Sequence, residues 1–313
     1  MNLSDEEQIK IGIDLGGTKI EMIVLDESGA ILRQQRISTP AGDYQATILA
    51  ISGLVHEFEK GQQVMASVGI GMPGAISPAS GKVKNSNSVC LNGQNFQKDI
   101  ESALKRSVRI ENDANCFTLS EATDGAAAGA KIVFGVILGT GVGGGLVING
   151  ALITGPNAIA GEWGHNPLPW PEGKELEEAT VCYCGKTSCI ETWLCGAGLS
   201  TTYQTISDQD CTPPEIVNLA TLNDELAEQA LESYFRRLAK SLASVINILD
   251  PDVIVLGGGL SNIRQIYSSV PELWNDYVFS DRVDTKLVAA KYGDASGVRG
   301  AAWLGSEMKI HNH

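Results

Sequence analysis

Short apolar runs alternate with amphipathic stretches and glycine-rich turns along the chain, a pattern typical of α/β proteins. Residues 11–15 are predicted to form a strand, residues 16–19 a turn, and residues 20–25 a second strand. Residues 132–149 repeat this strand-turn-strand pattern. Because the two halves open alike, we expect a duplicated fold with a cleft between the halves. Further strands are predicted at 64–70, 107–110 and 252–256, and a helix at 44–59.

A long helix is predicted late in the chain, where apolar side chains recur at helical spacing between Leu226 and Leu249. Pro251 ends this helix, because proline has no backbone N–H to continue the hydrogen-bond ladder. The strand at 252–256 then runs directly into Gly257, Gly258 and Gly259. A third apolar strand is therefore followed by a glycine turn.

The length of 313 residues and the hydrophobic content of 43% favour two domains with a sizeable core. We expect a small α/β domain at 1–122, completed by the C-terminal segment 293–313, and a large α/β domain at 123–292. The boundary is placed near residues 120–130, around the small-residue stretch 125–130, where the linker could equally be a helix.

The charge balance excludes some classes of partner. The chain has 23 basic and 37 acidic side chains, a formal net charge of -14, so nucleic acid and anionic membranes would meet a repulsive field. Residues 132–148 carry no charge, but their glycines favour two strands over a membrane helix. The polar N-terminus does not look like a signal peptide, and an odd number of cysteines, seven, suits a reducing compartment. We therefore expect a cytoplasmic protein.

Three glycine turns follow apolar strands, and their backbone N–H groups suit the binding of phosphate. The first turn adds the Thr18 hydroxyl, the Lys19 charge, and Asp14 as a ligand for hydrated Mg²⁺. It lacks the spacing of a P-loop, and taken alone it is equally well explained as a hairpin turn. Recurrence in both halves favours a nucleotide site across the cleft. The candidate ATP and Mg²⁺ residues are Asp14, Gly16, Gly17, Thr18, Lys19, Gly139, Thr140, Gly141, Gly143, Gly257, Gly258 and Gly259.

The order of these motifs resembles the sugar kinases of the actin-like ATPase superfamily. The motifs are Asp-Leu-Gly-Gly-Thr-Lys at 14–19, Gly-Thr-Gly at 139–141 and Leu-Gly-Gly-Gly at 256–259. Within that superfamily, Glu-Asn-Asp-Ala-Asn-Cys at 111–116, Gly-Glu-Trp-Gly-His at 161–165 and Cys-Tyr-Cys-Gly-Lys-Thr-Ser-Cys-Ile-Glu at 182–191 resemble the ROK family. The resemblance runs from Ile11 to about Leu304. It implies a two-domain actin-like ATPase (ribonuclease H-like) fold with the active site in the interdomain cleft.

The resemblance implies a hexokinase-type reaction, in which MgATP phosphorylates a sugar hydroxyl and Asp113 takes the proton as general base. From the residues alone, Asp113 is better explained as the N-cap of a helix that follows it, and the two roles are compatible. Segments 84–93 and 165–170 are most similar to the fructokinases of the family, which implies conversion of D-fructose to D-fructose 6-phosphate. A homodimer is the family expectation. The implied sugar-binding residues are Asn87, Asn112, Asp113, Glu162, His165 and Glu191.

Four further residues, His165, Cys182, Cys184 and Cys189, suit a closed tetrahedral zinc site of the structural kind. Spacing alone leaves a cluster of free thiols as the alternative, because Cys-x-Cys departs from the usual Cys-x₂-Cys pair. The family pattern is complete at all four positions, and this resemblance favours zinc. His165 would then bind zinc through one ring nitrogen and the sugar through the other.

Other functions remain as alternatives. N-acetylglucosamine or N-acetylmannosamine kinases and glucokinases of the family share the same catalytic groups. A ROK transcriptional regulator is disfavoured, because only about ten residues precede the first strand and the net charge opposes DNA binding. A chaperone or filament protein of the superfamily would not explain the Gly-Glu-Trp-Gly-His segment or the cysteine cluster.

Overall fold

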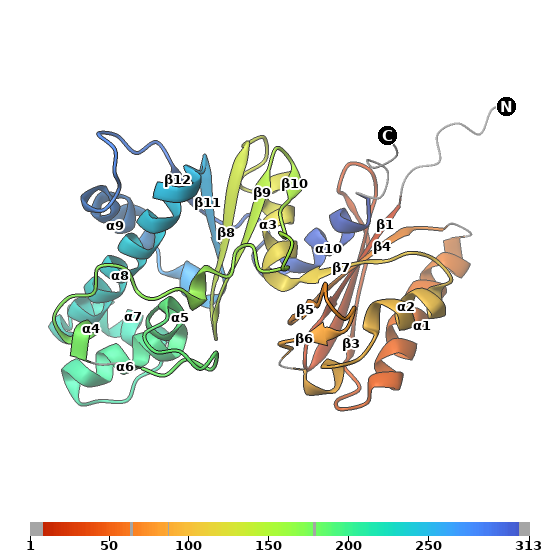
Figure 1. Ribbon diagram of the computed structural model, residues 1–313, viewed down its shortest axis with the longest axis horizontal. Helices are drawn as coiled ribbons and strands as arrows, with labels where there is room; N and C mark the ends of the chain where they lie inside the picture. Colours follow the sequence, from red (N-terminus) through yellow and green to blue (C-terminus); the bar gives the residue numbers. More distant parts are fainter. Residues whose placement is uncertain (1–8, 63–64, 87, 178–179, 307–313) are drawn as a thin grey trace.

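The computed structural model describes residues 9–62, 65–86, 88–177 and 180–306. It contains two five-stranded sheets of the same topology (Figure 1). In each sheet the first three strands pair antiparallel with one another, the fourth strand pairs parallel with the first, and the fifth pairs parallel with the fourth. The duplication predicted from the sequence is therefore confirmed.

The first sheet has the order β3-β2-β1-β4-β7, and the second has the order β10-β9-β8-β11-β12. The strands of the first sheet are β1 (Lys10–Leu15), β2 (Lys19–Leu25), β3 (Ile31–Ser38), β4 (Ser67–Met72) and β7 (Arg109–Asn112). Those of the second sheet are β8 (Ile132–Leu138), β9 (Val142–Ile148), β10 (Ala151–Leu152), β11 (Val253–Gly257) and β12 (Lys286–Ala289). A small hairpin pairs β5 (Ala75–Ile76) with β6 (Val83–Lys84).

Helices cover both faces of each sheet. On the first sheet, α1 (Tyr44–Gln62) and α2 (Phe96–Leu104) share one apolar cluster with the strands. Two further helices, α3 (Asp113–Thr123) and α10 (Ser296–Ser306), lie between the two sheets (Figure 1). The second sheet packs with α5 (Ile190–Leu194), α6 (Gly196–Ser207), α7 (Pro213–Thr221), α8 (Glu225–Leu249) and α9 (Ile266–Leu273), and the short α4 (Lys174–Glu177) lies beside α8.

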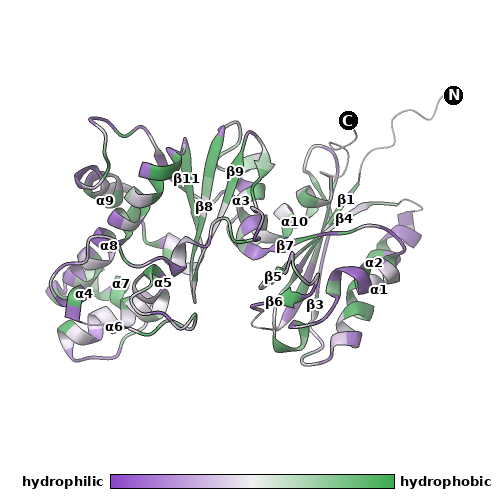
Figure 2. Cartoon of the chain, in the orientation of Figure 1, coloured by the Kyte–Doolittle hydropathy of each residue, from purple (hydrophilic) through white to green (hydrophobic). Residues whose placement is uncertain are grey.

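Side chains alternate between the two faces of the central strands, as the period of a strand requires. In β8, Phe134, Val136 and Leu138 join the cluster with α5 to α9, whereas Val133 faces the helices between the sheets. Figure 2 shows β8 and β11 as hydrophobic along most of their length. This burial on both faces explains why these strands appear in the sequence as nearly continuous apolar runs.

Most predicted elements are confirmed, with shifted ends. The late helix forms as α8 and the helix at 44–59 extends to Gln62 as α1. The strand expected at 64–70 is β4, which begins at Ser67; residues 63 and 64 lie outside the described part of the chain. The strand expected at 107–110 begins and ends two residues later, because the β7 register pairs Arg109 with Gly69 of β4.

The last helix of each half packs against the sheet of the other half. Helix α10, which follows the second sheet, lies on β1 and β4, and α3, which follows the first sheet, lies on β8 and β9. Glycines make this close approach feasible, since a Cβ at Gly12 would lie 2.2 Å from the Val298 carbonyl oxygen of α10. A Cβ at Gly300 of α10 would lie 1.6 Å from the Cys116 carbonyl oxygen of α3, so the two helices cross in backbone contact.

The expected domain limits stay predictions. All of helix α3 but its last residue falls within the expected small domain, yet the helix packs on the sheet of the expected large domain. Helix α10 falls within the expected C-terminal completion of the small domain and packs on that domain's sheet, and residues 307–313 lie outside the described chain.

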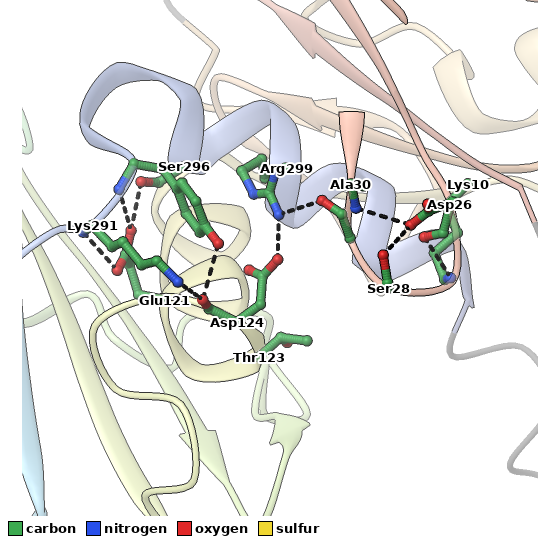
Figure 3. A network of polar contacts seen from close by, with 12 residues as sticks. Lys10, Asp26, Ser28, Ala30, Glu121, Thr123, Asp124, Lys291, Ser296 and Arg299 are labelled. Carbon is green, nitrogen blue, oxygen red and sulfur yellow. Dashed lines mark hydrogen bonds and ion pairs between the residues drawn. The ribbon is translucent and has the colours of Figure 1, made fainter. Parts of the chain in front are cut away.

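A polar network joins the end of α3 to the start of α10 (Figure 3). The buried Glu121 carboxylate accepts hydrogen bonds from the Ser296 hydroxyl at 2.7 Å and the Lys291 backbone N–H at 3.0 Å. Asp124 forms an ion pair with Arg299, which also donates to the Gly29 carbonyl at 2.9 Å. These contacts fix the crossing helices to the turn between β2 and β3.

Among the described residues, no helix combines the length and the apolar character needed to cross a membrane.

The helix crossing predicts a contrast between two glycines of α10. Gly300→Ala should lower the free energy of unfolding by about 3 kcal/mol or more, because the new methyl group would overlap the α3 backbone. Gly297→Ala is the matched control, since no atom lies within 4 Å of its added Cβ, and it should be neutral or stabilise by up to about 1 kcal/mol through helix propensity. Chemical unfolding of both variants measures the difference, and equal stability would contradict the described crossing.

Candidate active site

Two carboxylates, Asp14 and Asp113, lie close enough to influence each other. Asp14 is on the face of β1 that carries Gly12, and Asp113 begins α3. Burial, followed by the negative charge of Asp113, raises the pKa of Asp14 to about 6. Asp113 is exposed to solvent, but the protein around its carboxylate displaces part of the water that would stabilise the charge. This desolvation raises the pKa of Asp113 as well. Two such oxygen donors suit a hard cation such as Mg²⁺, which would relieve their repulsion.

The helix cap belongs to Asn112 and not to Asp113. The Asn112 Oδ1 atom accepts the Asn115 backbone N–H at 2.7 Å, as an N-cap does. Asp113 is the first residue of α3, and its Oδ1 atom accepts the adjacent Ala114 N–H at 2.9 Å. The interpretation of Asp113 as the cap is therefore wrong by one position.

The first glycine turn is a hairpin between β1 and β2. The Gly16 N–H donates to the Lys19 carbonyl at 2.9 Å, and the Thr39 hydroxyl donates to the Gly16 carbonyl at 2.8 Å. The Lys19 ammonium lies 3.7 Å from Glu21, which is buried. Gly17 and Thr18 are near the tip of this hairpin, and both are exposed. The hairpin explanation is thus geometrically correct, and it leaves the tip open to a ligand.

The second and third glycine turns meet each other. The Gly139 N–H donates to the Gly141 carbonyl at 3.0 Å and closes the β8–β9 hairpin, where Thr140 is exposed. Gly258 has a φ of +82°, and a Cβ there would lie 2.4 Å from the carbonyl oxygen of Leu138 in β8. A Cβ at Gly257 would lie 2.4 Å from the Phe117 ring of α3. Packing alone therefore requires glycine at 257 and 258.

Gly143 places the second turn beside the start of α3. A Cβ at Gly143 would lie 3.1 Å from the Ala114 Cβ, one residue after Asp113. The start of α3, where Asp113 lies, therefore packs against Gly143 of the second sheet. The charge of Asp113 also acts on Asp14 of the first sheet. Residues expected at one site from both halves of the chain are brought together at this point.

The four candidate metal ligands converge. The ligand atoms of His165, Cys182, Cys184 and Cys189 all lie within 4.8 Å of one another. The Cys184 and Cys189 sulfurs are 3.6 Å apart, and the Cys182 sulfur is 3.6 Å from the His165 Nδ1 atom. Zn–S bonds of about 2.3 Å give tetrahedral edges of nearly this length. All seven cysteines lie in the described part of the chain and are free thiols, so the donor set fits a zinc ion.

Local backbone pairing builds this cluster from three segments. His165 ends a short 3-10 helix at Trp163–His165, and Cys189 directly precedes α5. A bridge between Pro167 and Cys189 joins the two segments. The Cys182 N–H donates to the Lys186 carbonyl at 2.8 Å, which closes the tight turn that carries Cys184.

Glu191 connects the cysteine cluster to the second glycine turn. Its Oε2 atom accepts the Val142 N–H at 3.0 Å, and its Oε1 atom lies 3.7 Å from the Cys182 sulfur. Glu162 immediately precedes the 3-10 helix that holds His165 and is exposed. Asn87 lies outside the described residues. Its neighbour Asn92 stabilises the loop, accepting from the Ser86 N–H at 2.9 Å and donating to the Ser86 carbonyl at 2.7 Å.

Tyr183 is a neighbour of these residues to which the sequence motifs assigned no role. Its hydroxyl lies 2.9 Å from the His165 Nε2 atom, and the two rings meet edge to face. Although Tyr183 is 79% exposed, partial desolvation of its hydroxyl and the negative charges of Glu191 and Glu162 raise the pKa of Tyr183 to about 12. The sequence did contain a sign of this contact. Tyr183 stands between Cys182 and Cys184, and a residue between two ligands of one metal site is held close to the other ligands, His165 among them.

Comparison with known proteins agrees with this arrangement of motifs. The profile of the ROK family matches residues 10–308. The chain belongs to the ROK family. It is 39% identical over 302 residues to the N-acetyl-D-glucosamine kinase of Salmonella paratyphi B, with 94% of this chain and 98% of that protein covered.

Two crystal structures of the ROK family share the fold. The hexokinase of Thermus thermophilus is 28% identical and superposes with a TM-score of 0.84, covering 95% of this chain and 97% of its own. The glucokinase of Streptomyces griseus, in complex with glucose and AMPPNP, is 26% identical with a TM-score of 0.74, covering 95% and 98%. The chain therefore has the two-domain actin-like ATPase fold implied by its motifs.

Proposed function

We propose that this protein is an ATP-dependent hexose kinase. Asp113 carries the proposal: it is exposed, has a raised pKa, interacts electrostatically with Asp14, and does not cap α3, because Asn112 does so. A carboxylate so placed suits a general base, because a higher pKa increases its tendency to accept a proton near neutral pH. The kinase names of the relatives support the same reaction class.

The proposed roles follow from position in the fold. Asp113 accepts the proton of the attacking sugar hydroxyl, while Asp14 and the glycine turns hold MgATP. Mg²⁺, when bound, neutralises phosphate charge. Carboxylate, amide and imidazole groups suit sugar hydroxyls, which both donate and accept hydrogen bonds. The proposed sugar-binding residues are Asn112, Asp113, Glu162, His165 and Glu191, with Asn87 outside the described chain.

The proposed sugar is N-acetyl-D-glucosamine in the first place, because the Salmonella paratyphi B kinase, 39% identical over nearly the whole chain, carries that name. The names of the relatives give no support to the expectation of fructose. Fructose stays as the second candidate, since segments 84–93 and 165–170 resemble fructokinases. The alternative function as a transcriptional regulator is not supported by Asp113, because DNA binding does not require an exposed general base. The homodimer and the cytoplasmic location stay predictions.

An ADP-release assay over a panel of hexoses tests the function. Purified, zinc-loaded protein with MgATP should release ADP only when a hexose is present, with N-acetyl-D-glucosamine giving the highest kcat/KM among N-acetyl-D-glucosamine, N-acetyl-D-mannosamine, glucose, mannose and fructose. The background is ATP hydrolysis without sugar. A highest kcat/KM for fructose would assign the second candidate and leave the kinase assignment intact, whereas no stimulation by any of the sugars would refute it.

Asp113→Asn separates catalysis from folding. The substitution removes the base while Asn112 keeps capping α3, so kcat should fall by at least about 100-fold with little change in Tm. Because desolvation raises the pKa of Asp113, kcat of the unmodified protein should fall on acidification at a higher pH than for an ordinary aspartate. Near-normal kcat in the variant would remove Asp113 from the chemistry.

We further propose that His165, Cys182, Cys184 and Cys189 hold one structural Zn²⁺. The donor types and their spacing support zinc over a hard cation, because thiolates favour soft or borderline metals. The His165 Nδ1 atom faces the cysteine sulfurs, which leaves the Nε2 side of the ring toward Tyr183 and the proposed sugar position. Loss of the metal would thus loosen both His165 and Glu191.

Metal removal tests this coupling. The purified protein should contain about one zinc per chain. Cys184→Ser should lose zinc and raise the sugar KM by about 10-fold or more, with much less effect on the KM for ATP. Cys211→Ser is the matched control, because Cys211 is a free thiol outside the cluster. An unchanged sugar KM in zinc-free protein would contradict the coupling.

A further inference from the structure

A buried ion cluster joins α4 to α8 and contains none of the proposed sugar-binding or metal-binding residues. Glu175 of α4 lies between two cations of α8, with the Arg237 Nε atom at 2.7 Å and the Lys240 ammonium in direct contact. The Lys240 side chain is 1% exposed and that of Glu175 is 11% exposed. Burial of these charges costs desolvation energy, which the ion pairs and hydrogen bonds of the cluster must offset.

Lys240 fixes a second point of the segment that joins His165 to Cys182. Its ammonium donates to the Trp170 carbonyl at 2.9 Å. Trp170 has a φ of +44°, a strained value for a residue with a Cβ, and its ring packs on Tyr277 with centroids 5.3 Å apart. The segment between the first and second proposed zinc ligands is therefore attached to α8 at Trp170 and at Glu175.

Arg237 contacts the helices that follow Cys189. Its guanidinium lies 4.5 Å from the centroid of the Trp193 ring, and its Nη1 atom donates to the Thr202 hydroxyl at 2.7 Å. Trp193 is in α5, two residues after Glu191. Two neighbouring cations of one helix thus hold the chain before Cys182 and the helix after Cys189.

We propose that the cluster of Glu175, Arg237 and Lys240 is a positioning device for the sugar-binding residues His165 and Glu191, with Glu175 as the residue that joins the two cations. This inference rests on the proposed hexose kinase function. The side chains of the cluster act through the backbone of 166–177 and through Trp193. Weakening the cluster should therefore impair sugar binding and zinc retention, while ATP binding at the glycine turns is preserved.

Glu175→Gln is the first test, and Glu177→Gln is its matched control. Glu177 lies in the same short helix and is exposed, so the control makes the same change of charge without reaching the cluster. Glu175→Gln should raise the sugar KM by about 10-fold, as loss of a supporting contact typically does. The KM for ATP should change by less than about twofold, and zinc should pass to a chelator several-fold faster than in the unmodified protein. The control should match the unmodified protein in all three measurements.

A double variant separates positioning from stability. Glu175→Gln leaves the charges of both Lys240 and Arg237 without their carboxylate and should lower Tm. Glu175→Gln with Lys240→Met leaves only Arg237, which keeps its contacts with Thr202 and Trp193, and should recover part of that loss. The double variant also lacks the bond to Trp170, so its sugar KM should stay high and its zinc loss fast. Recovery of KM together with Tm, or equal effects of Glu177→Gln, would overturn the positioning role. Without hexose-dependent ADP release in the unmodified protein, the proposed function fails, and the rate of zinc loss still tests the cluster.

Discussion

The backbone contact between α3 and α10 is the constraint on which the arrangement of the molecule depends. Each helix follows one sheet and packs on the other, so the helix crossing joins the two halves. At the crossing, Gly300 admits the Cys116 carbonyl to a distance that no side chain would permit. The hydrogen bond of Glu121 with Ser296 and the ion pair of Asp124 with Arg299 then attach the C-terminal end of α3 to the N-terminal part of α10. Cohesion between the sheets therefore combines backbone proximity and buried polar contacts with an apolar cluster that α3 and α10 share with the second sheet.

The same crossing sets the geometry of the proposed active site. Asp113 begins α3, which is seated on the second sheet, whereas Asp14 lies on the face of the first sheet that receives α10. The separation of the two carboxylates therefore depends on how α3 and α10 cross. A rotation of one sheet relative to the other about this crossing would change their distance, and with it the repulsion that raises the pKa of Asp14. A bound cation between them would oppose such a rotation.

Periodicity predicted the parts of the fold that depend on local sequence. The central strands and α8 have regular apolar spacing, and their positions followed from it. The exchange of α3 and α10 did not, because residues 114–121 of α3 are all buried and give no amphipathic pattern to assign a face. The cap was misplaced because Asn112 and Asp113 are both good N-caps and adjacent. The contact of Glu175 with Lys240 joins residues far apart in sequence, for which no local pattern exists.

The glycine turns were the clearest indication of a nucleotide site in the sequence. In the second and third turns, the structure shows two kinds of glycine. Gly257 and Gly258 are glycines because Phe117 and the Leu138 carbonyl occupy the space of a Cβ, so glycine at these positions serves packing. Gly139 and Gly259 differ: no described atom lies within 4 Å of an added Cβ, and neither has a left-handed φ. Neither packing nor backbone conformation explains glycine at these two positions. The space around these two glycines is open, as close approach of a ligand requires, and this agrees with the proposed phosphate contacts at the tips of the turns.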